Sequence, residues 1–314
     1  MGVSYVNRMN MLGYGVRVVI FIFLILRLFS AGFALAADKP RSGRDILWES
    51  YQRSTTRLSA NSFGLPLYLD SFELEDRVHV DVYGIFDYPF SSIVSALKVP
   101  ATWCDIVTLH PNVKACTHRE RSGDWLLTFY LGRKFYQPPE DADLVVYRYR
   151  NVMQQQGYLD IVLTADVGPL GSDDHRMRFE ALPLDGGKTF VHVSYSYSDT
   201  LALRLAGKLY FSTLGRSKAG FTVTGRDSND KPVLIGGPRG AVERNAVRYY
   251  LAIQAYMSTS AYPEESRFRM RGSQWYDLTI HFRKQLFDLE KAEYLTIKAA
   301  EQKNQAILQR SQVN

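Results

Sequence analysis

The stretch WCDIVTLHPNVKAC, residues 103–116, contains both cysteines of the chain, with His110 between Cys104 and Cys116. Thiolate and imidazole groups bind zinc, so these three residues and His118 make a formal ligand set, although their spacings are wider than in common zinc motifs. A redox pair normally has two residues between its cysteines, which is not the spacing here. A structural disulfide is the third alternative, and the cellular compartment distinguishes among them.

The first 36 residues have the layout of a secretory signal peptide. Arg8 and Arg17 precede an apolar run, and Ala34-Leu35-Ala36 has the small residues of a cleavage site. Arg27 disfavours the alternative of a retained membrane anchor, because a charge near the centre of a spanning helix costs about 3 kcal/mol. We therefore expect cleavage after Ala36 and export to a periplasm. Disulfides persist there, so the two cysteines are expected to pair rather than stay free or bind zinc.

The composition is that of a globular protein. Of 314 residues, 46% are hydrophobic and 13% aromatic, enough for one large core or two modest ones. The net charge of +6 becomes +3 without the three arginines of the signal segment, since 35 basic residues then face 32 acidic ones. This excess is too small to indicate a nucleic-acid partner. The sequence also lacks a nucleotide-binding glycine loop, a His-Glu-x-x-His motif and a Gly-x-Ser-x-Gly motif.

The N-terminal half predicts a helix, a hairpin and two further helices. The segment GRDILWESYQRSTTRL predicts a short helix that ends near Ser59. Apolar and polar residues alternate on both sides of Glu75-Asp76, which predicts a hairpin. Its second arm directs Val78, Val80, Val82 and Phe86 to one face. Pro89 suits the first turn of the helices that follow.

From Val113 to Tyr197 the sequence has a period of two almost throughout. Five segments with short connections alternate apolar and polar side chains. They predict an antiparallel, meander-like sheet with one apolar face. Such a face needs a cover.

Three C-terminal segments supply candidates for that cover. TLALRLAGKLYFSTLG predicts a helix, and FTVTGRDSNDKPVLIGG predicts a hairpin. The helix predicted from Gly240 to Ser258 has the strongest pattern, with Arg244 and Arg248 off its apolar stripe. The stripe consists of Val242, Ala246, Tyr249, Ile253, Tyr256 and Met257. Pro263 ends this element, and one helix of about 35 residues follows, packed in its first half and solvated or bound to a partner in its second.

This order of elements resembles the START-like (SRPBCC) superfamily. The resemblance spans roughly Leu65 to Ser260 and rests on the order of elements and on the segments DVYGIFDYPFSSIVSAL and ERNAVRYYLAIQAYM. It implies an α+β helix-grip fold, in which a curved antiparallel sheet wraps around a long C-terminal helix. The late hairpin and the extra C-terminal helix depart from the simplest version of that fold.

The resemblance also implies a division of the chain. Residues 1–36 would form the signal peptide and residues 37–64 an N-terminal helical extension. The START-like domain would span residues 65–260, followed by a C-terminal helical extension over residues 261–314.

The function that the resemblance implies is binding or carriage of a hydrophobic small molecule, such as a lipid or sterol, in an internal cavity. Tyrosines offer an apolar ring and a hydroxyl that can orient a polar head group. The predicted ligand-binding residues are Tyr147, Tyr149, Phe179, Tyr195, Tyr197, Tyr249, Ile253 and Tyr256. No cofactor and no metal are expected. The alternative is a filled core, in which these aromatic residues only pack.

Two further functions remain open. An enzyme of the cyclase or hydrolase type in the same fold would need Asp105 and His110 to converge in the cavity. Asp160 and His192 are weaker candidates, because alternation places both on the solvent side of the sheet. An envelope scaffold would instead act through the C-terminal helix.

The basic residues are candidates for transient contact with a membrane surface. Arg267, Arg269 and Arg271 alternate in RFRMR, whereas Arg244 and Arg248 share a helical face. Either group could contact anionic lipid head groups.

Overall fold

The computed structural model describes residues 41–312, except residues 75, 156, 214, 216 and 217. The predicted signal peptide lies outside the described residues. Residues Gly43–Asn314 form one compact unit. No helix among the described residues has both the length and the apolar character that a membrane span requires.

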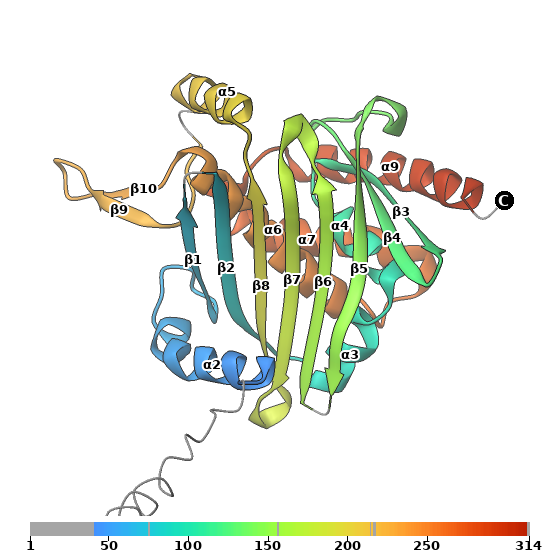
Figure 1. Ribbon diagram of the computed structural model, residues 1–314, viewed down its shortest axis with the longest axis horizontal. Coiled ribbons are helices and arrows are strands. Elements are labelled where there is room, and N and C mark those ends of the chain that lie inside the picture. Colours follow the sequence, from blue (N-terminus) through green and yellow to red (C-terminus); the bar gives the residue numbers. More distant parts are fainter. Residues whose placement is uncertain (1–40, 75, 156, 214, 216–217, 313–314) are drawn as a thin grey trace, which may run out of the picture. The chain divides into compact units, whose positions relative to one another are not determined.

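An eight-stranded antiparallel sheet organises the unit (Figure 1). Its order is β1-β2-β8-β7-β6-β5-β4-β3, so β3 to β8 form a continuous meander and the N-terminal hairpin joins at β8. The strands are β1 (Leu67–Glu73), β2 (Arg77–Phe86), β3 (Val113–Arg121), β4 (Asp124–Leu131), β5 (Asp143–Gln155), β6 (Tyr158–Val167), β7 (Asp173–Pro183) and β8 (Thr189–Ser198). The predicted meander and hairpin are both confirmed.

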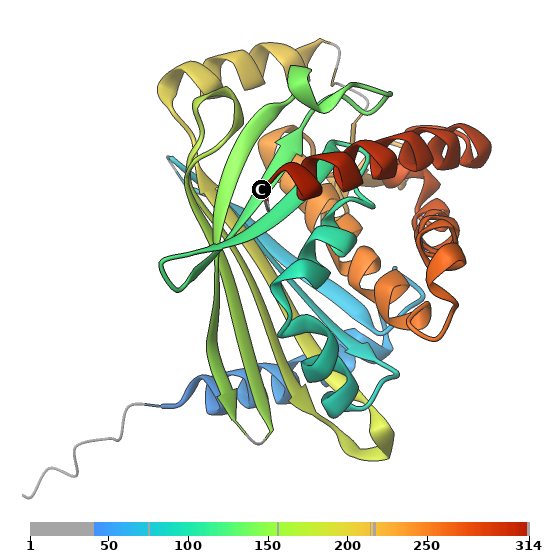
Figure 2. The ribbon, with the colours of Figure 1, turned by 90° about the vertical axis from the view of Figure 1, so that its right-hand side faces the viewer.

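Helices cover the apolar face of this sheet, and Figure 2 shows the two layers from the side. The long helix α6 (Gly237–Ser258) packs there with α3 (Phe90–Leu97) and α4 (Pro100–Val107). The helix α2 (Gly43–Ser59) packs on the opposite face. The connections contain the short helices η1 (Pro139–Asp141), η2 (Pro169–Gly171) and η3 (Asp185–Gly187). This arrangement is the helix-grip fold, so the predicted fold class is confirmed.

The chain between β8 and α6 forms the two elements that the sequence predicts there. They are the helix α5 (Leu201–Ser212) and the hairpin of β9 (Val223–Arg226) and β10 (Pro232–Leu234). Residues Val223 to Arg226 are exposed along the whole of β9. The hairpin therefore adds little to the core.

A glycine lets α6 approach the sheet closely. A Cβ atom at Gly84 of β2 would lie 2.0 Å from the Tyr250 hydroxyl oxygen of α6, closer than any nonbonded contact allows. The Tyr250 ring instead packs beside Phe86, with 5.1 Å between the ring centroids. The absence of a side chain at Gly84 thus allows the short distance between α6 and β2 at Tyr250.

The helix α6 is buried on nearly all sides, which corrects the expected polar face. Arg244 and Arg248, expected off the buried stripe, are only 7% and 2% exposed. The Arg248 guanidinium donates to Asp288 at 2.7 Å, and this ion pair replaces the water that a surface arginine would have. Neither arginine is therefore available to lipid head groups.

The predicted single C-terminal helix is wrong, because three helices occupy this segment. They are α7 (Glu264–Ile280), α8 (Arg283–Leu286) and α9 (Lys291–Ser311). Pro263 begins α7 as its N-cap residue. Phe282 interrupts the helical pattern, with φ −106° and ψ 45°. Its ring lies edge-on to Phe63 and Phe221, at centroid distances of 5.7 and 5.6 Å, so tertiary packing of aromatic rings outweighs local helix propensity.

Buried charges hold α9 against β3. The Lys298 ammonium donates to the carbonyl oxygens of His110 and Val113 and to the Glu301 carboxylate, at 2.7 to 2.9 Å. Glu301 also accepts from Lys114 at 2.7 Å. Burial and the nearby ammonium of Lys114 oppose the attraction of Glu301 and lower the pKa of Lys298 to about 8. In the second half, the side-chain amides of Gln305 and Gln309 accept from the backbone N–H groups of Cys116 and His118 at 2.8 and 2.9 Å. The helix α9 is therefore bound to β3 in both halves, and the expected solvated second half is wrong.

A charged network lies on the face of the sheet opposite α6. His192 is only 9% exposed and lies between Asp81 and Glu180, 2.8 Å from each carboxylate. Asp160 is 4% exposed and pairs with Arg178. The predicted alternation is correct for both residues, but this side of the sheet is buried at His192 instead of open to solvent. Neighbouring strands and the ring of Tyr83, stacked on His192 at 4.5 Å, exclude the solvent.

The disulfide between Cys104 and Cys116 is present and joins α4 to β3. The two Cα atoms are 5.0 Å apart, which lies within the usual range. The pairing removes both sulfur atoms from the formal zinc set. The described residues contain no group of three or more side chains that could hold a metal ion.

The disulfide should stabilise the protein measurably. Replacing both residues, Cys104→Ala with Cys116→Ala, should lower the free energy of unfolding by about 3 kcal/mol, since the bond restricts the unfolded chain. Urea denaturation of the wild type with and without reductant should show the same difference. The double variant should not respond to reductant, and equal stability of all four samples would contradict the prediction.

The His192 network should give stability a specific pH dependence. Burial opposes the charge of His192, but its hydrogen bonds to Asp81 and Glu180 outweigh burial and raise its pKa to about 9. An unfolded histidine titrates near about 6.5, so the stabilisation is complete below that pH and is lost as the pH rises to about 9. The difference in free energy of unfolding between wild type and His192→Gln should shrink by about 3 kcal/mol across this window. A constant difference would show that His192 does not titrate against the carboxylates.

Candidate functional site

A cavity of about 580 Å³ lies between the sheet and α6. Strands β4, β5, β7 and β8 supply one wall, and α6 with the turn after α4 supplies the other. The connections that contain η1 and η2 form its rim, where Arg133, Asp141 and Asp143 are exposed. The remaining lining residues are His110, Asn112, Phe129, Leu131, Gly132, Gln137, Tyr147, Pro169, His175, Met177, Tyr195, Asn245 and Tyr249.

A chain of hydrogen bonds crosses the sheet wall of this cavity. The Ser172 hydroxyl donates to the Pro169 carbonyl oxygen at 2.7 Å, so the 2.8 Å contact with His175 has Nε2–H as its donor. His175 Nδ1 then accepts from the Tyr195 hydroxyl at 2.9 Å. The ring of Tyr147 lies edge-on to His175 in the same wall, with 6.5 Å between the ring centroids. Each donor thus points along the chain towards η2.

A bulge and a glycine place His175 in the wall. The β7–β8 register shifts between Asp173 and Arg176, and Asp174 has a positive φ of 52° at this point. A Cβ atom at Gly168 would lie 1.9 Å from His175 Nε2, so only glycine leaves room for the imidazole beside η2. The ring of Tyr197 stacks on the other side, with 5.4 Å between centroids. The imidazole is thus fixed in position.

The groups in the wall are uncharged near neutral pH. Burial lowers the pKa of His175 to about 4. Burial also raises the pKa of Tyr147, Tyr195 and Tyr249 well above the usual value. The hydrogen-bond chain therefore offers neutral donors and acceptors instead of a charge.

The opposite end of the cavity has a second neutral histidine. The backbone N–H of Asn112 donates to His110 Nδ1 at 3.1 Å, so Nε2–H donates to the Asn245 amide oxygen at 3.3 Å. Burial and the neighbouring Arg248 guanidinium lower the pKa of His110 well below its usual value. The His110 ring stacks on Tyr249 at 5.0 Å. Asn245 itself lines the cavity.

Five of the eight predicted ligand-binding residues face the space between sheet and helix. Tyr147, Tyr195 and Tyr249 line the main cavity. Phe179 and Ile253 line a void of only about 10 Å³ deeper in the core, where Tyr249 also contributes. That void holds about one water molecule at most. The main cavity is therefore bounded by the first three residues.

The other three predicted residues lie elsewhere. Tyr197 stacks on the ring of His175 but is not one of the residues that line the cavity. The Tyr149 hydroxyl donates to the carbonyl oxygen of Lys98 at 3.0 Å, and its ring lines a separate open depression. Tyr256 lies under Arg271, whose guanidinium carbon is 4.1 Å from the ring centroid. Alternation predicts which face of the sheet a side chain lies on. It does not predict where along that face a cavity is left between the sheet and the helix.

The residues proposed for catalysis do not converge. Asp105 pairs with Arg271 of α7 at 2.7 Å, whereas His110 bonds Asn245 inside the cavity. Arg271 is 4% exposed and thus removed from membrane contact. Arg269 is exposed, and Arg267 is partly buried with its Nε bonded to the Tyr262 carbonyl oxygen.

His175 is one of the lining residues that the sequence prediction did not include, with Asn112, Phe129, Met177 and Asn245 among the others. Its alternation with Met177 and Phe179 places it on the inward face, so a signal was present. The predicted strand segment HRMRFEALP begins at His175, whereas β7 begins two residues earlier, at Asp173. Contact with Tyr195 depends on the bulge, which the sequence pattern does not reveal.

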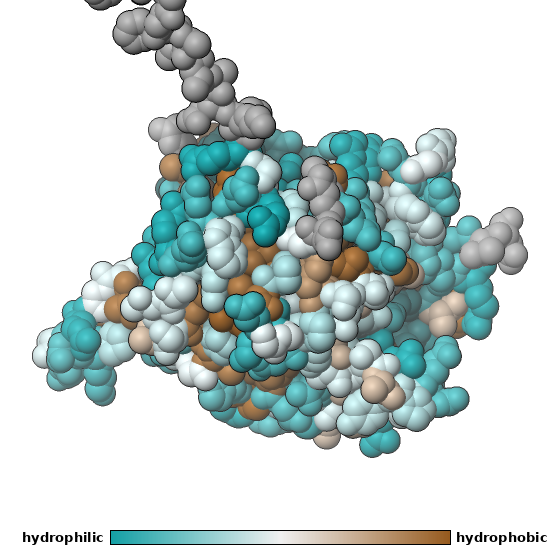
Figure 3. All heavy atoms as spheres, turned by 90° about the horizontal axis from the view of Figure 1, so that it is seen from below, coloured by the Kyte–Doolittle hydropathy of each residue, from teal (hydrophilic) through white to brown (hydrophobic). Residues whose placement is uncertain are grey.

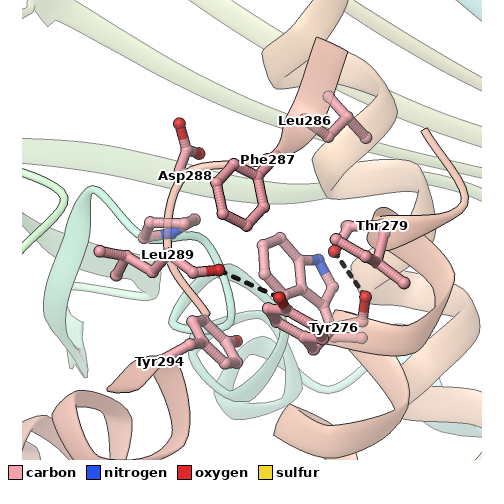
Figure 4. A pocket seen from close by; sticks show the side chains of 10 residues that line it. Tyr276, Thr279, Leu286, Phe287, Asp288, Leu289 and Tyr294 are labelled. Atoms are coloured by element: carbon pink, nitrogen blue, oxygen red, sulfur yellow. Dashed lines mark hydrogen bonds between the residues drawn. The ribbon is translucent and has the colours of Figure 1, made fainter. Parts of the chain in front are cut away.

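Two other hollows are less suited to a ligand. Side chains of α7, α8 and α9 surround a void of about 10 Å³ (Figure 4), where the Tyr276 hydroxyl donates to the Leu289 carbonyl oxygen at 3.1 Å. Aromatic packing between Trp275 and Tyr294 fills most of that region. The depression beside Tyr149 measures about 570 Å³ but is shallow and open. Hydrophobic side chains also gather in the middle of the lower end of the unit, inside a hydrophilic margin (Figure 3).

Comparisons with known proteins add likenesses of fold only. No model of a protein family matches the chain, and no curated protein sequence does. Among solved structures, a STAR-related lipid transfer protein from Xanthomonas axonopodis is 14% identical, with 47% of this chain and 89% of that chain covered and a TM-score of 0.32. Human StAR-related lipid transfer protein 5 is 10% identical, with 67% and 94% covered and a TM-score of 0.32. Truncated norcoclaurine synthase from Thalictrum flavum is 10% identical, with 46% and 90% covered and a TM-score of 0.32. At these values the helix-grip assignment rests on the strand order and the place of α6 in this chain.

Proposed function

We propose that the protein binds and carries an amphipathic small molecule in the cavity between the sheet and α6. The observation that supports this most is the cavity itself, about 580 Å³ with an exposed rim and a wall of tyrosines and His175. Ligand sites in proteins commonly measure about 300 to 1,000 Å³ and combine apolar lining with a few placed polar groups. A solid core would leave only voids of about one water molecule.

Apolar contacts would provide most of the binding free energy. Phe129, Leu131 and Met177 offer hydrophobic surface beside the tyrosine rings. Burial of about 300 Å² of apolar ligand surface would contribute on the order of 7 kcal/mol before the cost of association is subtracted. The chain of hydroxyl and imidazole groups would then orient the polar end.

The direction of that hydrogen-bond chain favours a ligand that donates a hydrogen bond. The Tyr195 proton is directed to His175, so the Tyr195 oxygen is left as an acceptor, to which a hydroxyl or amine of the ligand would donate. A carboxylate or ester there would require the chain to reverse, which breaks the Ser172 hydroxyl bond to Pro169. One such bond is worth about 1 kcal/mol, or roughly fivefold in affinity.

One observation supports the second candidate, an enzyme of the cyclase type. Histidine and tyrosine hydroxyls within hydrogen-bond distance can transfer protons to a bound substrate. A Ser–His hydrolase is less well supported, because the Ser172 hydroxyl donates to the Pro169 carbonyl oxygen and not to His175. Conversion of a bound ligand into a product of different mass would distinguish the enzyme from a carrier.

The proposed place of action is an exported compartment, with the first 36 residues as its signal. The disulfide supports this, because such bonds persist in oxidising spaces. The third candidate, a scaffold that acts through its C-terminal helix, is less well supported, since Tyr294, Lys298 and Glu301 of α9 are buried in the unit itself.

Filling part of the cavity should weaken binding. Met177 lines both the main cavity and the small void beside Phe179, so Met177→Trp should occupy space that the ligand needs. We expect affinity for a fluorescently labelled long-chain alcohol to fall at least about tenfold, with a loss of stability of about 1 to 3 kcal/mol from overpacking. Fluorescence titration measures the first quantity and thermal unfolding the second.

The matched control is Val146→Trp, which adds the same indole to a half-exposed position on the outer face of β5. It should bind the alcohol as the wild type does. If the wild type binds nothing, or if both variants bind equally well, the cavity is not the binding site.

Removing one hydroxyl should reveal the head-group preference. Tyr195→Phe should weaken binding of the alcohol about fivefold, because the acceptor chain is broken, and should leave the methyl ester of the same chain length unchanged. Tyr149→Phe is the control, since it removes a buried tyrosine hydroxyl that bonds Lys98 outside the cavity. Equal losses in both variants, or equal effects on alcohol and ester, would contradict the assigned direction.

A further inference from the structure

The two edges of the sheet differ in how their backbone groups are paired. At β3, the side chains of Gln305 and Gln309 accept from backbone N–H groups, so α9 covers that edge. The strand β1 forms the opposite edge, and the β9–β10 hairpin lies beyond it (Figure 1). An uncovered edge strand is a template on which another extended chain can pair.

The ladder between β1 and β2 shows which backbone groups of β1 are free. The Leu74 N–H donates to the Arg77 carbonyl oxygen at 2.8 Å, so the even-numbered residues of β1 bond β2. Alternation then directs the N–H and C=O groups of Leu69 and Ser71 away from β2. No described residue bonds these four groups. Ser71 is only 8% exposed, and backbone groups buried to this extent nearly always have a partner.

An open hollow of about 370 Å³ lies beside these groups. Its lining includes Leu69 and Ser71 of β1, and Phe221 and Val223 at the start of the β9–β10 hairpin. Phe63 also lines it and stacks on Phe221, with 5.1 Å between the ring centroids. The hollow therefore offers an extended chain both unpaired backbone groups and an apolar surface.

Arg239, in the first turn of α6, lines the same hollow with a fixed guanidinium. Its Nε donates to the Ser71 hydroxyl oxygen at 2.7 Å, and no carboxylate of the described residues lies within ion-pair distance of it. The Asp70 carboxylate in this lining pairs with Arg57 at 3.0 Å. Glu243, which bonds the Ser71 hydroxyl, already accepts from four donors. The other N–H groups of Arg239 are therefore suited to a carboxylate from outside the chain.

We propose that the edge of β1 binds an extended peptide segment of a partner protein, which adds a strand at Leu69 and Ser71 and places a carboxylate at Arg239. Two N–H and two C=O groups of the peptide backbone pair with the four free groups of β1. An apolar side chain of the peptide packs on Phe63 and Phe221. The carboxylate belongs to an acidic side chain or to the C terminus. This binding does not require a ligand in the cavity.

A display library of random heptapeptides with free C termini provides the probe. It is selected against the chain from residue 37 onwards, which retains the compact unit Gly43–Asn314. We expect selected peptides that lack proline, alternate apolar residues and carry a carboxylate, and the best of them is synthesised for fluorescence anisotropy. Methylation of two alternate backbone nitrogens should weaken its binding at least about tenfold, because hydrogen bonds to β1 are lost. Amidation of either the C terminus or the acidic side chain distinguishes the two sources of the carboxylate.

Variants of the protein test the same contacts. Leu69→Pro removes an N–H group that bonds nothing in the fold, a change that edge strands tolerate. It should bind the peptide at least about fivefold more weakly than Leu69→Ala, which keeps the N–H. Arg239→Gln should lose about tenfold in affinity for the peptide and nothing for its amide version. The control Arg226→Gln removes an exposed guanidinium outside the hollow and should bind like the wild type.

Four outcomes would overturn the proposal. The first is a wild type that selects no peptide, and the second is equal binding of the methylated and unmethylated peptides, a comparison that does not need Leu69→Pro to fold. The third is equal binding by Leu69→Pro and Leu69→Ala, or by Arg239→Gln and the wild type. The fourth is a dimer in analytical ultracentrifugation that Leu69→Pro converts to a monomer, without peptide binding, which would make β1 a contact between two copies. Titration of the fluorescent alcohol reports the cavity separately.

Discussion

The packing of α6 between two layers is the constraint on which the rest of the structure depends. One side of the helix reaches the sheet, because Gly84 leaves room for Tyr250. The other side is tied to the C-terminal helices by the ion pair of Arg248 with Asp288. Burial opposes the charge of Asp288, but the cations of Arg248 and Lys134 outweigh it and lower the pKa of the carboxyl. Breaking one partner of such a buried pair costs about 3 to 5 kcal/mol, so α6 cannot swing freely towards the sheet.

The cavity follows from this constraint. Tyr250 fixes the distance between α6 and β2, whereas Asn245 and Tyr249 face strands that curve away, and the space there is not filled by side chains. The bulge of β7 adds a neutral histidine to the wall, and Gly168 leaves room for it. A rigid apolar space with one directional chain of hydrogen bonds selects for shape and for one kind of polar end group. No charged group of this chain needs to contact the ligand for such selection.

Sequence periodicity predicted the layers and most of their contents. Alternation in β2 and in β4 to β8 gave the inward face correctly, and the apolar spacing of Val242, Ala246 and Ile253 identified the central helix. The disulfide followed from the expected compartment. These features depend on the spacing of residues within one segment or on composition, so they can be predicted from the sequence directly.

Features that join distant segments were not predictable in this way. Phe282 ends a helix because it meets Phe63 and Phe221, and Arg248 is buried because Asp288 lies beside it. His175 belongs to the site through a register shift against β8. The division into residues 37–64, 65–260 and 261–314 stays a prediction, although α2 and α9 both pack on the sheet.

A crystal structure of the protein purified from its own cells tests the central claim most directly. The account predicts elongated density between the sheet and α6, with its polar end about 3 Å from the hydroxyl oxygen of Tyr147 or Tyr195. An interior closed by the side chains of Met177 and Tyr249, with no space for a ligand, would contradict it.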